Sequence, residues 1–150
     1  MTALLKDLAS TTVAVIEPEA TAQTVAQVMR RDHIGALVVV DALDENKPLG
    51  IVTDRDLVIE LMAEGLDPGI FTAGDIMSVN LVLASPEMDA MQAIELMRTH
   101  RVRRLVLVDA AGQLAGIVTL EDLLQCLSAE LGGLASALAG AQDRETAERP

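Results

Sequence analysis

The feature that most constrains this chain is an internal repeat. The stretch Gly50-Ile51-Val52-Thr53-Asp54-Arg55-Asp56 returns as Gly116-Ile117-Val118-Thr119-Leu120-Glu121-Asp122. The apolar runs 37–41 and 105–109 are related by a shift of 68 positions, and the two glycine stretches by a shift of 66, because the turn between them is two residues longer in the first copy. Such self-similarity predicts two copies of one supersecondary unit that share a core.

Each copy shows the same order of secondary structure. Short apolar segments at 13–16 and 79–83 precede apolar positions at helical spacing over 21–31 and 88–100. The runs 37–40 and 105–108 are typical of strands buried on both faces, and the Gly-Ile-Val strand and a closing helix follow them. Because about 60 residues bury too little surface alone, we predict an α/β (α+β) fold of two β-α-β-β-α repeats, packed sheet to sheet with pseudo-twofold symmetry.

The predicted boundaries follow this repeat. Repeat 1 spans 6–64, a linker spans 65–74, repeat 2 spans 75–131, and a C-terminal extension spans 132–150. Residues 64–69 mark the linker because they are rich in turn-forming types. A longer helical segment over 120–138 is expected to be interrupted at Gly132-Gly133, and the polar residues 140–150 are expected to be disordered.

The threonines of the repeated stretch stand at a helix entrance. Asp56 follows Thr53, and Asp122 follows Thr119, at the third position, which is the pattern of a capping box. A capped helix is the common interpretation. A helix N-terminus also presents free N–H groups and a positive dipole end to anions such as phosphates. Because the pattern occurs twice in matching contexts, an anion-binding site becomes a more plausible interpretation.

The chain is strongly acidic, with a net charge of −12 and a sequence pI near 4.4. This balance argues against binding to nucleic acids or anionic membranes, which depends on Lys and Arg. Four of the 11 basic residues fall within 98–104, just before the strand of the second repeat. Such a cluster is either a salt-bridged surface, which is the more frequent case, or an anion site.

Targeting and disulfide signals are also informative. The single Cys126 cannot form an internal disulfide, which fits a reducing compartment. Residues 1–7 lack the pattern of a signal peptide, and unbroken apolar runs such as 36–40 are far shorter than a bilayer span. We therefore expect a cytoplasmic protein that does not bind membranes.

Catalytic and metal-binding patterns are not expected. His33 and His100 have no neighbouring cysteine, and the acidic residues lack the spacing of a calcium loop. The order of Ser, His, Asp and Cys residues suggests no nucleophilic constellation. We expect no enzyme, no metal and no required cofactor.

The two copies resemble a tandem pair of cystathionine-beta-synthase (CBS) domains, called a Bateman module, over roughly residues 6–130. The resemblance rests on the strands that end at Asp41 and Asp109, the Gly-Ile-Val-Thr stretches, and the aspartates Asp56 and Asp122. It implies a stand-alone regulatory module that binds AMP, ADP or ATP, with S-adenosylmethionine or NAD less expected, and signals to an unknown effector protein. The alternative is a ligand-free dimerising or scaffolding protein.

Residue by residue, the resemblance implies that Asp56 and Asp122 bind ribose hydroxyls and that Thr53 and Thr119 donate to phosphate or ribose. The base would lie against the strand entrances, with backbone groups near Val13 and Leu81 at its edge. Three arginines are the phosphate candidates. The full set of predicted ligand-binding residues is Asp56, Thr53, Asp122, Thr119, Arg55, Arg103, Arg104, Ile34, Gly35, Ala36, Val102, Val13 and Leu81.

The two halves differ at this predicted site. The second copy has Leu120-Glu121 at the place of Arg55, and the first copy has Gly35-Ala36 where the second has Arg103-Arg104. We therefore favour one good site over two. The resemblance also implies a homodimer through helical faces, for which the apolar segments 57–62 and 123–131 are the candidates.

Overall fold

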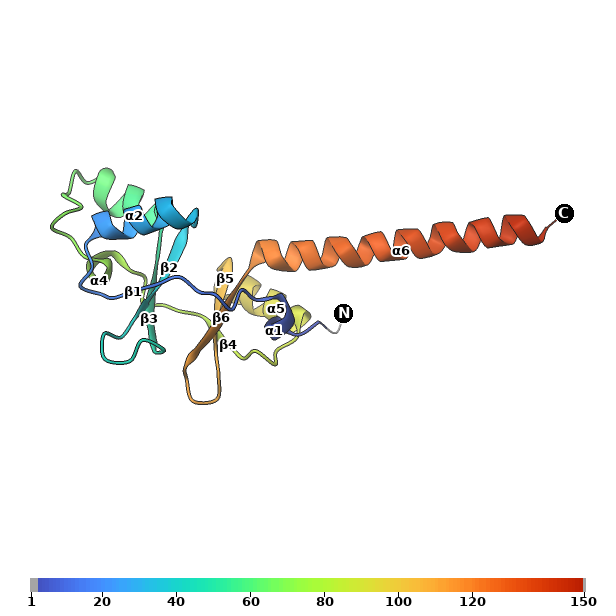
Figure 1. Ribbon diagram of the computed structural model, residues 1–150, viewed down its shortest axis with the longest axis horizontal. Helices are drawn as coiled ribbons and strands as arrows, with labels where there is room; N and C mark the ends of the chain where they lie inside the picture. The colour runs from blue at the N-terminus through green and yellow to red at the C-terminus, as the bar shows by residue number, and fades with distance from the viewer. Residues whose placement is uncertain (1–2, 150) are drawn as a thin grey trace.

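The computed structural model describes residues 3–149, so Met1, Thr2 and Pro150 of the segments discussed above lie outside the described residues. Figure 1 shows two small units side by side and one long helix, α6, that projects from them. The elements are α1 (Leu5–Leu8), β1 (Val15–Ile16), α2 (Ala22–Asp32), β2 (Ala36–Val40), β3 (Pro48–Thr53), α3 (Asp54–Asp56), η1 (Leu57–Met62), α4 (Ala73–Ile76), β4 (Leu83–Ala84), α5 (Ala90–His100), β5 (Arg104–Val108), β6 (Leu114–Thr119) and α6 (Leu120–Glu148).

Two three-stranded sheets follow the predicted repeat. Their orders are β1-β2-β3 and β4-β5-β6, and in each the first pair of strands is parallel and the second antiparallel. Val38 lies opposite Ile51 and Val106 opposite Ile117, and both sheets have a register irregularity at the end of the central strand. The predicted α/β (α+β) fold with two repeats is confirmed.

The central strands hold the core together. Residues 37–40 and 105–107 are at most 2% exposed, as expected for apolar runs that are covered on both faces. One side of each strand packs on the helices of its own repeat. The other side joins the two repeats, because Val38, Val40 and Val106 form one cluster between the sheets. The sheets therefore pack face to face, as the sequence predicts.

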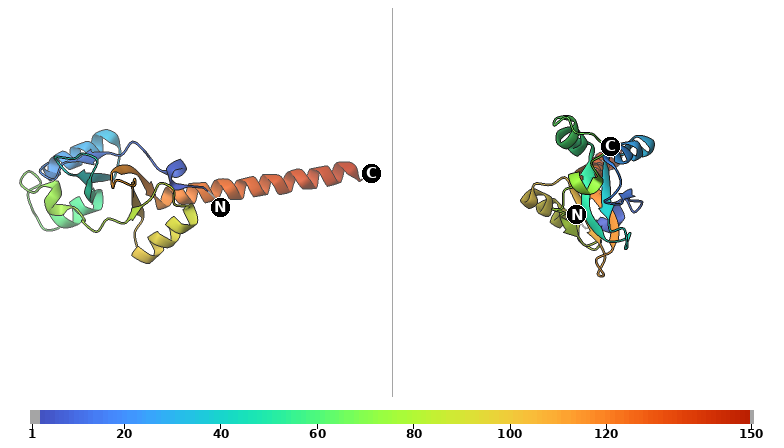
Figure 2. Two further views of the ribbon diagram at one scale, coloured as in Figure 1. Left: turned by 90° about the horizontal axis from the view of Figure 1, so that it is seen from below. Right: turned by 90° about the vertical axis from the view of Figure 1, so that its left-hand side faces the viewer.

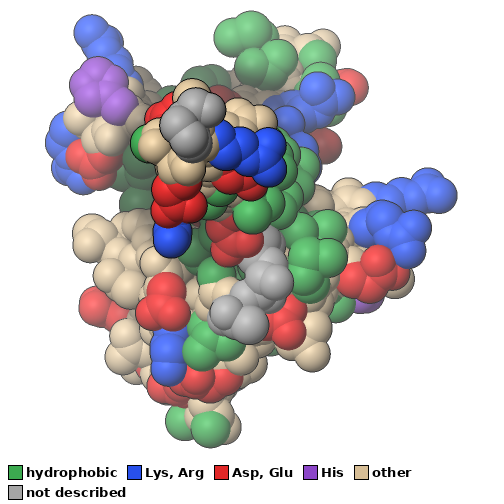
Figure 3. Space-filling model, turned by 90° about the vertical axis from the view of Figure 1, so that its right-hand side faces the viewer, with side chains coloured by type: hydrophobic (Ala, Val, Ile, Leu, Met, Phe, Trp, Pro, Cys, Tyr) green, Lys and Arg blue, Asp and Glu red, His purple; other side chains and the backbone are tan. Residues whose placement is uncertain are grey.

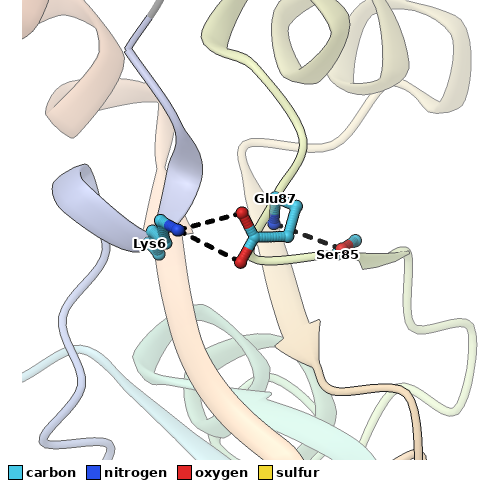
Figure 4. Close-up of polar contacts among 3 residues, drawn as sticks. All are labelled: Lys6, Ser85 and Glu87. Atoms are coloured by element: carbon cyan, nitrogen blue, oxygen red, sulfur yellow. Dashed lines mark hydrogen bonds and ion pairs between the residues drawn. The ribbon is translucent and has the colours of Figure 1, made fainter.

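Two short helices cross between the repeats. The Leu5 N–H donates to the Met88 carbonyl at 2.9 Å, and Leu5 is fully buried in the core of the second repeat. Lys6 reinforces this contact through both carboxylate oxygens of Glu87 (Figure 4). In the same way the Ala73 N–H donates to the Ala20 carbonyl at 2.8 Å, so α4 docks on the first repeat. The predicted boundaries assign residues 6–8 to repeat 1 and residues 75–76 to repeat 2, as the sequence repeat does. In the structure, α1 packs on the second repeat and α4 on the first.

The C-terminal extension differs from the expectation. Helix α6 runs from Leu120 to Glu148 without an interruption at Gly132-Gly133, and it includes residues 140–148 of the predicted disordered tail. A Cβ added at any of its three glycines would meet no neighbour within 4 Å, and each glycine costs only about 1 kcal/mol relative to Ala. The Arg144–Glu148 ion pair at 2.9 Å lies on its last turns.

The closing helices of the two repeats therefore differ. The first repeat ends in a short α3 that continues as the π-helical η1, whereas α6 extends far beyond the body of the molecule (Figure 2). By length and composition alone, α6 could cross a membrane, a test that core helices of soluble proteins and signal sequences can also pass.

Candidate functional site

Both predicted helix entrances are capping boxes. The Thr53 hydroxyl accepts from the Asp56 N–H at 3.2 Å, and the Asp56 Oδ2 accepts from the Thr53 N–H at 2.8 Å. Thr119 and Asp122 repeat this arrangement with the same two distances. Each half-buried carboxylate is thus fixed by the backbone through one oxygen, and Oδ1 has no hydrogen-bond partner among residues 3–149.

A cleft of about 190 Å³ lies between the repeats, at the entrance to β5. We call it the arginine cleft, after Arg103 and Arg104. Five of the predicted ligand-binding residues line it: Thr53, Leu81, Val102, Arg103 and Arg104. The sequence analysis missed the other lining residues, which are Ile51, Ser78, Asn80, Val82 and Val106. Both repeats contribute, because Ile51 and Thr53 belong to β3, whereas Arg104 is the first residue of β5 and Arg103 directly precedes it.

The missed residues belong to the crossing between repeats. The segment after α4 runs along the edge of β3, where Ser78 and Ile51 exchange backbone hydrogen bonds of 2.8 and 3.0 Å. This contact brings Ser78 and Asn80 to the strand that carries Thr53. The alignment of Ser78 with Ser10 by the repeat shift is the one sequence signal for it, since Ser10 pairs with Ile117 in the same way.

The basic cluster at 98–104 divides into two parts. Arg98 forms an ion pair with Glu95 at 2.8 Å, which is the salt-bridged surface considered above. The four ion pairs of the described residues involve Lys6, Arg31, Arg98 and Arg144, so Arg103 and Arg104 are without one. Nearby Glu121 has a lowered pKa, first because its carboxylate accepts from its own backbone N–H and also because of the positive charges of both arginines.

The matching positions in the first repeat, Gly35 and Ala36, carry no charge, and the carboxylate of Asp54 lies beside them. The Gly35 carbonyl accepts from the Asp54 N–H at 3.0 Å, and a Cβ at Gly35 would lie 3.0 Å from the Asp54 Oδ2. In the second repeat the Arg103 carbonyl accepts from the Leu120 N–H at 2.8 Å. The carboxylate of Asp54 therefore lies beside the start of β2, whereas the apolar side chain of Leu120 takes the matching place beside the start of β5. The remaining predicted residues at this end are Ile34, Ala36, Val13 and Thr119, all partly buried.

Eight of the thirteen predicted residues do not line the arginine cleft. Five of them are Ile34, Gly35, Ala36, Val13 and Thr119, and the other three are Asp56, Arg55 and Asp122. Asp56 lies three residues beyond Thr53 in the capping box, and Arg55 is exposed on α3. Asp122 lines a separate hollow of about 500 Å³ between α1 and α6, together with Asp7 and Glu130. That hollow has three carboxylates and no basic lining residue, so its charge disfavours a phosphate.

Comparison with known proteins identifies related sequences. The CBS domain family model matches residues 5–63 and 73–129. An uncharacterized protein of Methanopyrus kandleri is 43% identical over 108 residues, which cover 72% of this chain and 54% of that protein, so the chain spans about half the length of this relative. The CBS domain-containing protein YhcV of Bacillus subtilis is 38% identical over 119 residues, which cover 79% of this chain and 81% of that protein.

Solved structures share the fold. An uncharacterized conserved protein of Pyrococcus horikoshii superimposes with a TM-score of 0.75 at 25% identity, over 84% of this chain and 92% of that one. A CBS domain protein of Pyrobaculum aerophilum, complexed with AMP, superimposes with a TM-score of 0.73 at 23% identity, over 80% of this chain and 89% of that one.

Proposed function

The chain belongs to the CBS domain family, with two CBS repeats in tandem, and we propose that it is a regulatory module that binds an adenine nucleotide in the arginine cleft. The observation that carries the proposal is the pair Arg103 and Arg104, which line a cleft between the repeats and have no ion-pair partner among the described residues. In a chain of net charge −12, two arginines that line one cleft support a site for an anion.

The chemistry of the lining suits a nucleotide. Arginine presents several N–H donors in a planar fork, which matches the oxygens of a phosphate group. Ile51 and Val106 offer apolar surface to the face of a base, and Ser78 and Asn80 offer hydrogen bonds to its edge. A volume of about 190 Å³ is smaller than a typical ligand pocket of roughly 300–1,000 Å³, so the ligand would extend from the cleft into solvent.

The ribose is assigned to Asp56 in this proposal. Its Oδ2 is occupied by the Thr53 N–H, but Oδ1 is without a partner among the described residues and can accept from a hydroxyl. Thr53 lines the cleft and directly precedes the helix that carries Asp56. We expect AMP, ADP or ATP as the ligand, with S-adenosylmethionine and NAD as the less favoured candidates.

We propose one occupied site per chain. At the entrance to β2 the side chains of Gly35 and Ala36 cannot bind phosphate, and the Asp54 carboxylate beside Gly35 repels it. In this proposal Asp122, Thr119, Ile34, Val13 and Arg55 are not assigned to the bound nucleotide.

Binding between the repeats gives a route to signalling. A ligand that contacts Thr53 in one repeat and Arg104 in the other favours whichever relative orientation fits both, and a coupling of about 1–3 kcal/mol is typical of such regulation. In this proposal an effector protein reads the change, the module itself is not an enzyme, and it acts in the cytoplasm as a homodimer. Val58, Ile59 and Met62 on η1, and Leu124 and Leu131 on α6, are the exposed apolar side chains for that dimer.

The second candidate function is a scaffolding or dimerising protein without a physiological nucleotide. One observation favours it: both capping boxes are complete, so Thr53 and Asp56 have a structural role that needs no ligand. In this case the arginine cleft would stay free of nucleotide at cellular concentrations.

Equilibrium dialysis separates the two candidates. The chain has no Trp, no Tyr and one Phe, so bound AMP, ADP, ATP, S-adenosylmethionine or NAD can be measured directly from adenine absorbance. We expect excess nucleotide on the protein side, lost in the double variant Arg103→Ala/Arg104→Ala and retained in Arg30→Ala, which removes an exposed charge from α2. No excess for any of the five ligands at millimolar concentration would leave the scaffold as the function.

A further inference from the structure

Helix α6 presents leucines along one side at alternating intervals of four and three residues. They are Leu120, Leu124, Leu127, Leu131, Leu134 and Leu138, which we call the leucine seam. The mean interval is close to the 3.5 residues of a heptad, with Leu124, Leu131 and Leu138 at position a and the other three at position d. A repeat of this period keeps the same side of a supercoiled helix facing a partner.

Four of the six leucines of the seam are exposed in a single chain, whereas Leu127 is partly buried and Leu120 packs on the core of the second repeat. The exposed fractions of Leu124, Leu131, Leu134 and Leu138 are 57%, 65%, 69% and 62%. Figures 1 and 2 show that most of α6 extends beyond the two repeats, where no other described element covers it. Most of the stability of a protein helix comes from packing of its apolar face, and α6 also contains three glycines. We therefore expect the apolar side of α6 to be covered by a partner.

We propose that two copies of this chain pair through α6 as a parallel, in-register, two-stranded coiled coil along the leucine seam. A second copy supplies the complement directly, because a twofold axis parallel to the helices sets each leucine against the same leucine of the partner. Ser128, Ala135 and Ala137 flank the seam at positions e and g, and such small side chains let two helices approach closely.

Within the leucine seam, Glu130 favours the parallel orientation over the antiparallel one. Glu130 is at position g and faces Ala135 of the partner chain in a parallel pair. An antiparallel pair that matches all the leucine layers sets Leu120 against Leu138 of the partner chain, and this register brings the two Glu130 carboxylates together. Like charges at that position are destabilising. Glu145 and Glu148 continue the heptad at positions a and d, so their repulsion ends the parallel seam near Leu138.

A membrane fits this helix less well. The longest stretch of α6 without a charged side chain is 131–142, or 12 residues. At 1.5 Å per residue this is about 18 Å, whereas the hydrocarbon core of a bilayer is about 30 Å thick. Figure 3, viewed from the side to which α6 projects, shows basic and acidic side chains interspersed and not a basic patch that would attract anionic lipids.

Disulfide cross-linking tests both the pairing and its orientation. In a Cys126→Ala background, Leu138→Cys places one thiol in the seam, and Ser136→Cys places one on the opposite side of the same helix. With axes about 10 Å apart and Cα atoms 2.3 Å from each axis, facing Cα atoms lie roughly 5 Å apart, which permits a disulfide. An antiparallel pair would separate the two Leu138→Cys thiols by about 27 Å along the axis.

We expect Leu138→Cys to form an interchain disulfide about tenfold faster than Ser136→Cys under mild oxidation. Equal rates for the two variants would overturn the proposal. A second result would also overturn it. If Leu138→Cys is not cross-linked faster than Ser136→Cys, and the protein that has not been cross-linked floats with phosphatidylcholine vesicles, the apolar face of α6 binds lipid.

Sedimentation provides a second readout. The double variant Leu131→Glu/Leu134→Glu should weaken self-association by about a hundredfold or more. The control Ser136→Glu/Ala139→Glu adds the same charge at exposed positions outside the seam and should not. Equal association of the two variants would contradict the seam. The test is independent of nucleotide binding, so the arginine cleft and the leucine seam can fail separately.

Discussion

The two repeats have nearly the same backbone but different side chains at their strand entrances, where Gly35 and Ala36 of the first repeat match Arg103 and Arg104 of the second. Ala36 pairs with Thr53 in one sheet as Arg104 pairs with Thr119 in the other, and the register irregularity falls at the same place in both. Gly35 lies beside the carboxylate of Asp54, whereas Arg103 accepts a backbone hydrogen bond from the apolar residue Leu120. The comparison teaches that buried apolar positions and caps determine the repeat, and we propose that a few residues at the strand entrances determine which half binds an anion.

The largest expected effect tests the equivalence of the two cores. Leu37 and Leu105 are related by the repeat shift, and both are fully buried. Substitution of either by Ala should lower the free energy of unfolding by about 2–5 kcal/mol, and the two losses should be similar because the sites are matched. Urea unfolding measures both, with Leu43→Ala as the control, since Leu43 is 98% exposed. A loss at only one site would show that the repeats are not equivalent in packing.

The next prediction exchanges the charges of the rims. The triple variant Gly35→Arg/Ala36→Arg/Asp54→Leu gives the first repeat the residues of the second, and Asp54→Leu removes the carboxylate that a Cβ at Gly35 would approach. Each charge-assisted hydrogen bond is worth about 1.5–3 kcal/mol, so the variant should gain a second nucleotide site. Equilibrium dialysis at saturation measures the stoichiometry. Unchanged stoichiometry, with the fold intact by circular dichroism, would show that the backbone and not the charge distinguishes the halves.

The two caps should respond equally. Asp56→Ala and Asp122→Ala each remove an acceptor held at 2.8 Å from the threonine N–H, so each should cost about 0.5–2 kcal/mol of stability. Nucleotide binding should distinguish them, because the proposal assigns ribose to Asp56 alone. Asp56→Asn keeps a cap acceptor but removes the charge, so weakened binding at unchanged stability is expected. Equal loss of binding in Asp56→Ala and Asp122→Ala would contradict a single site.

The smallest effect concerns the crossing helix α1. Glu87 raises the pKa of Lys6, first through their hydrogen bond and then through its charge. A raised pKa means that the stabilisation is present below the unfolded-state pKa of about 10.4 and is lost as the pH rises through the folded-state pKa. Glu87→Gln should therefore lower the melting temperature slightly at neutral pH, and the difference from the parent should vanish in strong alkali. A constant difference at all pH values would mean that Glu87 acts through packing.

The sequence was sufficient for the local elements and their order. Continuous apolar runs predicted β2 and β5, and the Thr-x-x-Asp spacing predicted both capping boxes, because these features depend on neighbours within a few residues. The fold class followed from the repeat. These are the parts of the structure that short-range physics determines.

Features that depend on contacts between distant segments were not predictable in this way. The docking of Leu5 beside Met88 joins residues more than 80 positions apart, and nothing in either segment specifies the partner. The same crossing brings Ser78 and Asn80 into the arginine cleft. The continuity of α6 through Gly132-Gly133 was also missed, since the glycines lower helix propensity but have no steric conflict to end the helix.

The central claim is that the rim charges leave one nucleotide site per chain, between the repeats. Its most direct test is the saturation stoichiometry of ATP in equilibrium dialysis, measured on the parent protein and on Arg103→Ala/Arg104→Ala. We predict one ATP per chain for the parent and loss of this binding in the double variant. Two ATP molecules per chain, or one that the double variant retains, would contradict the account.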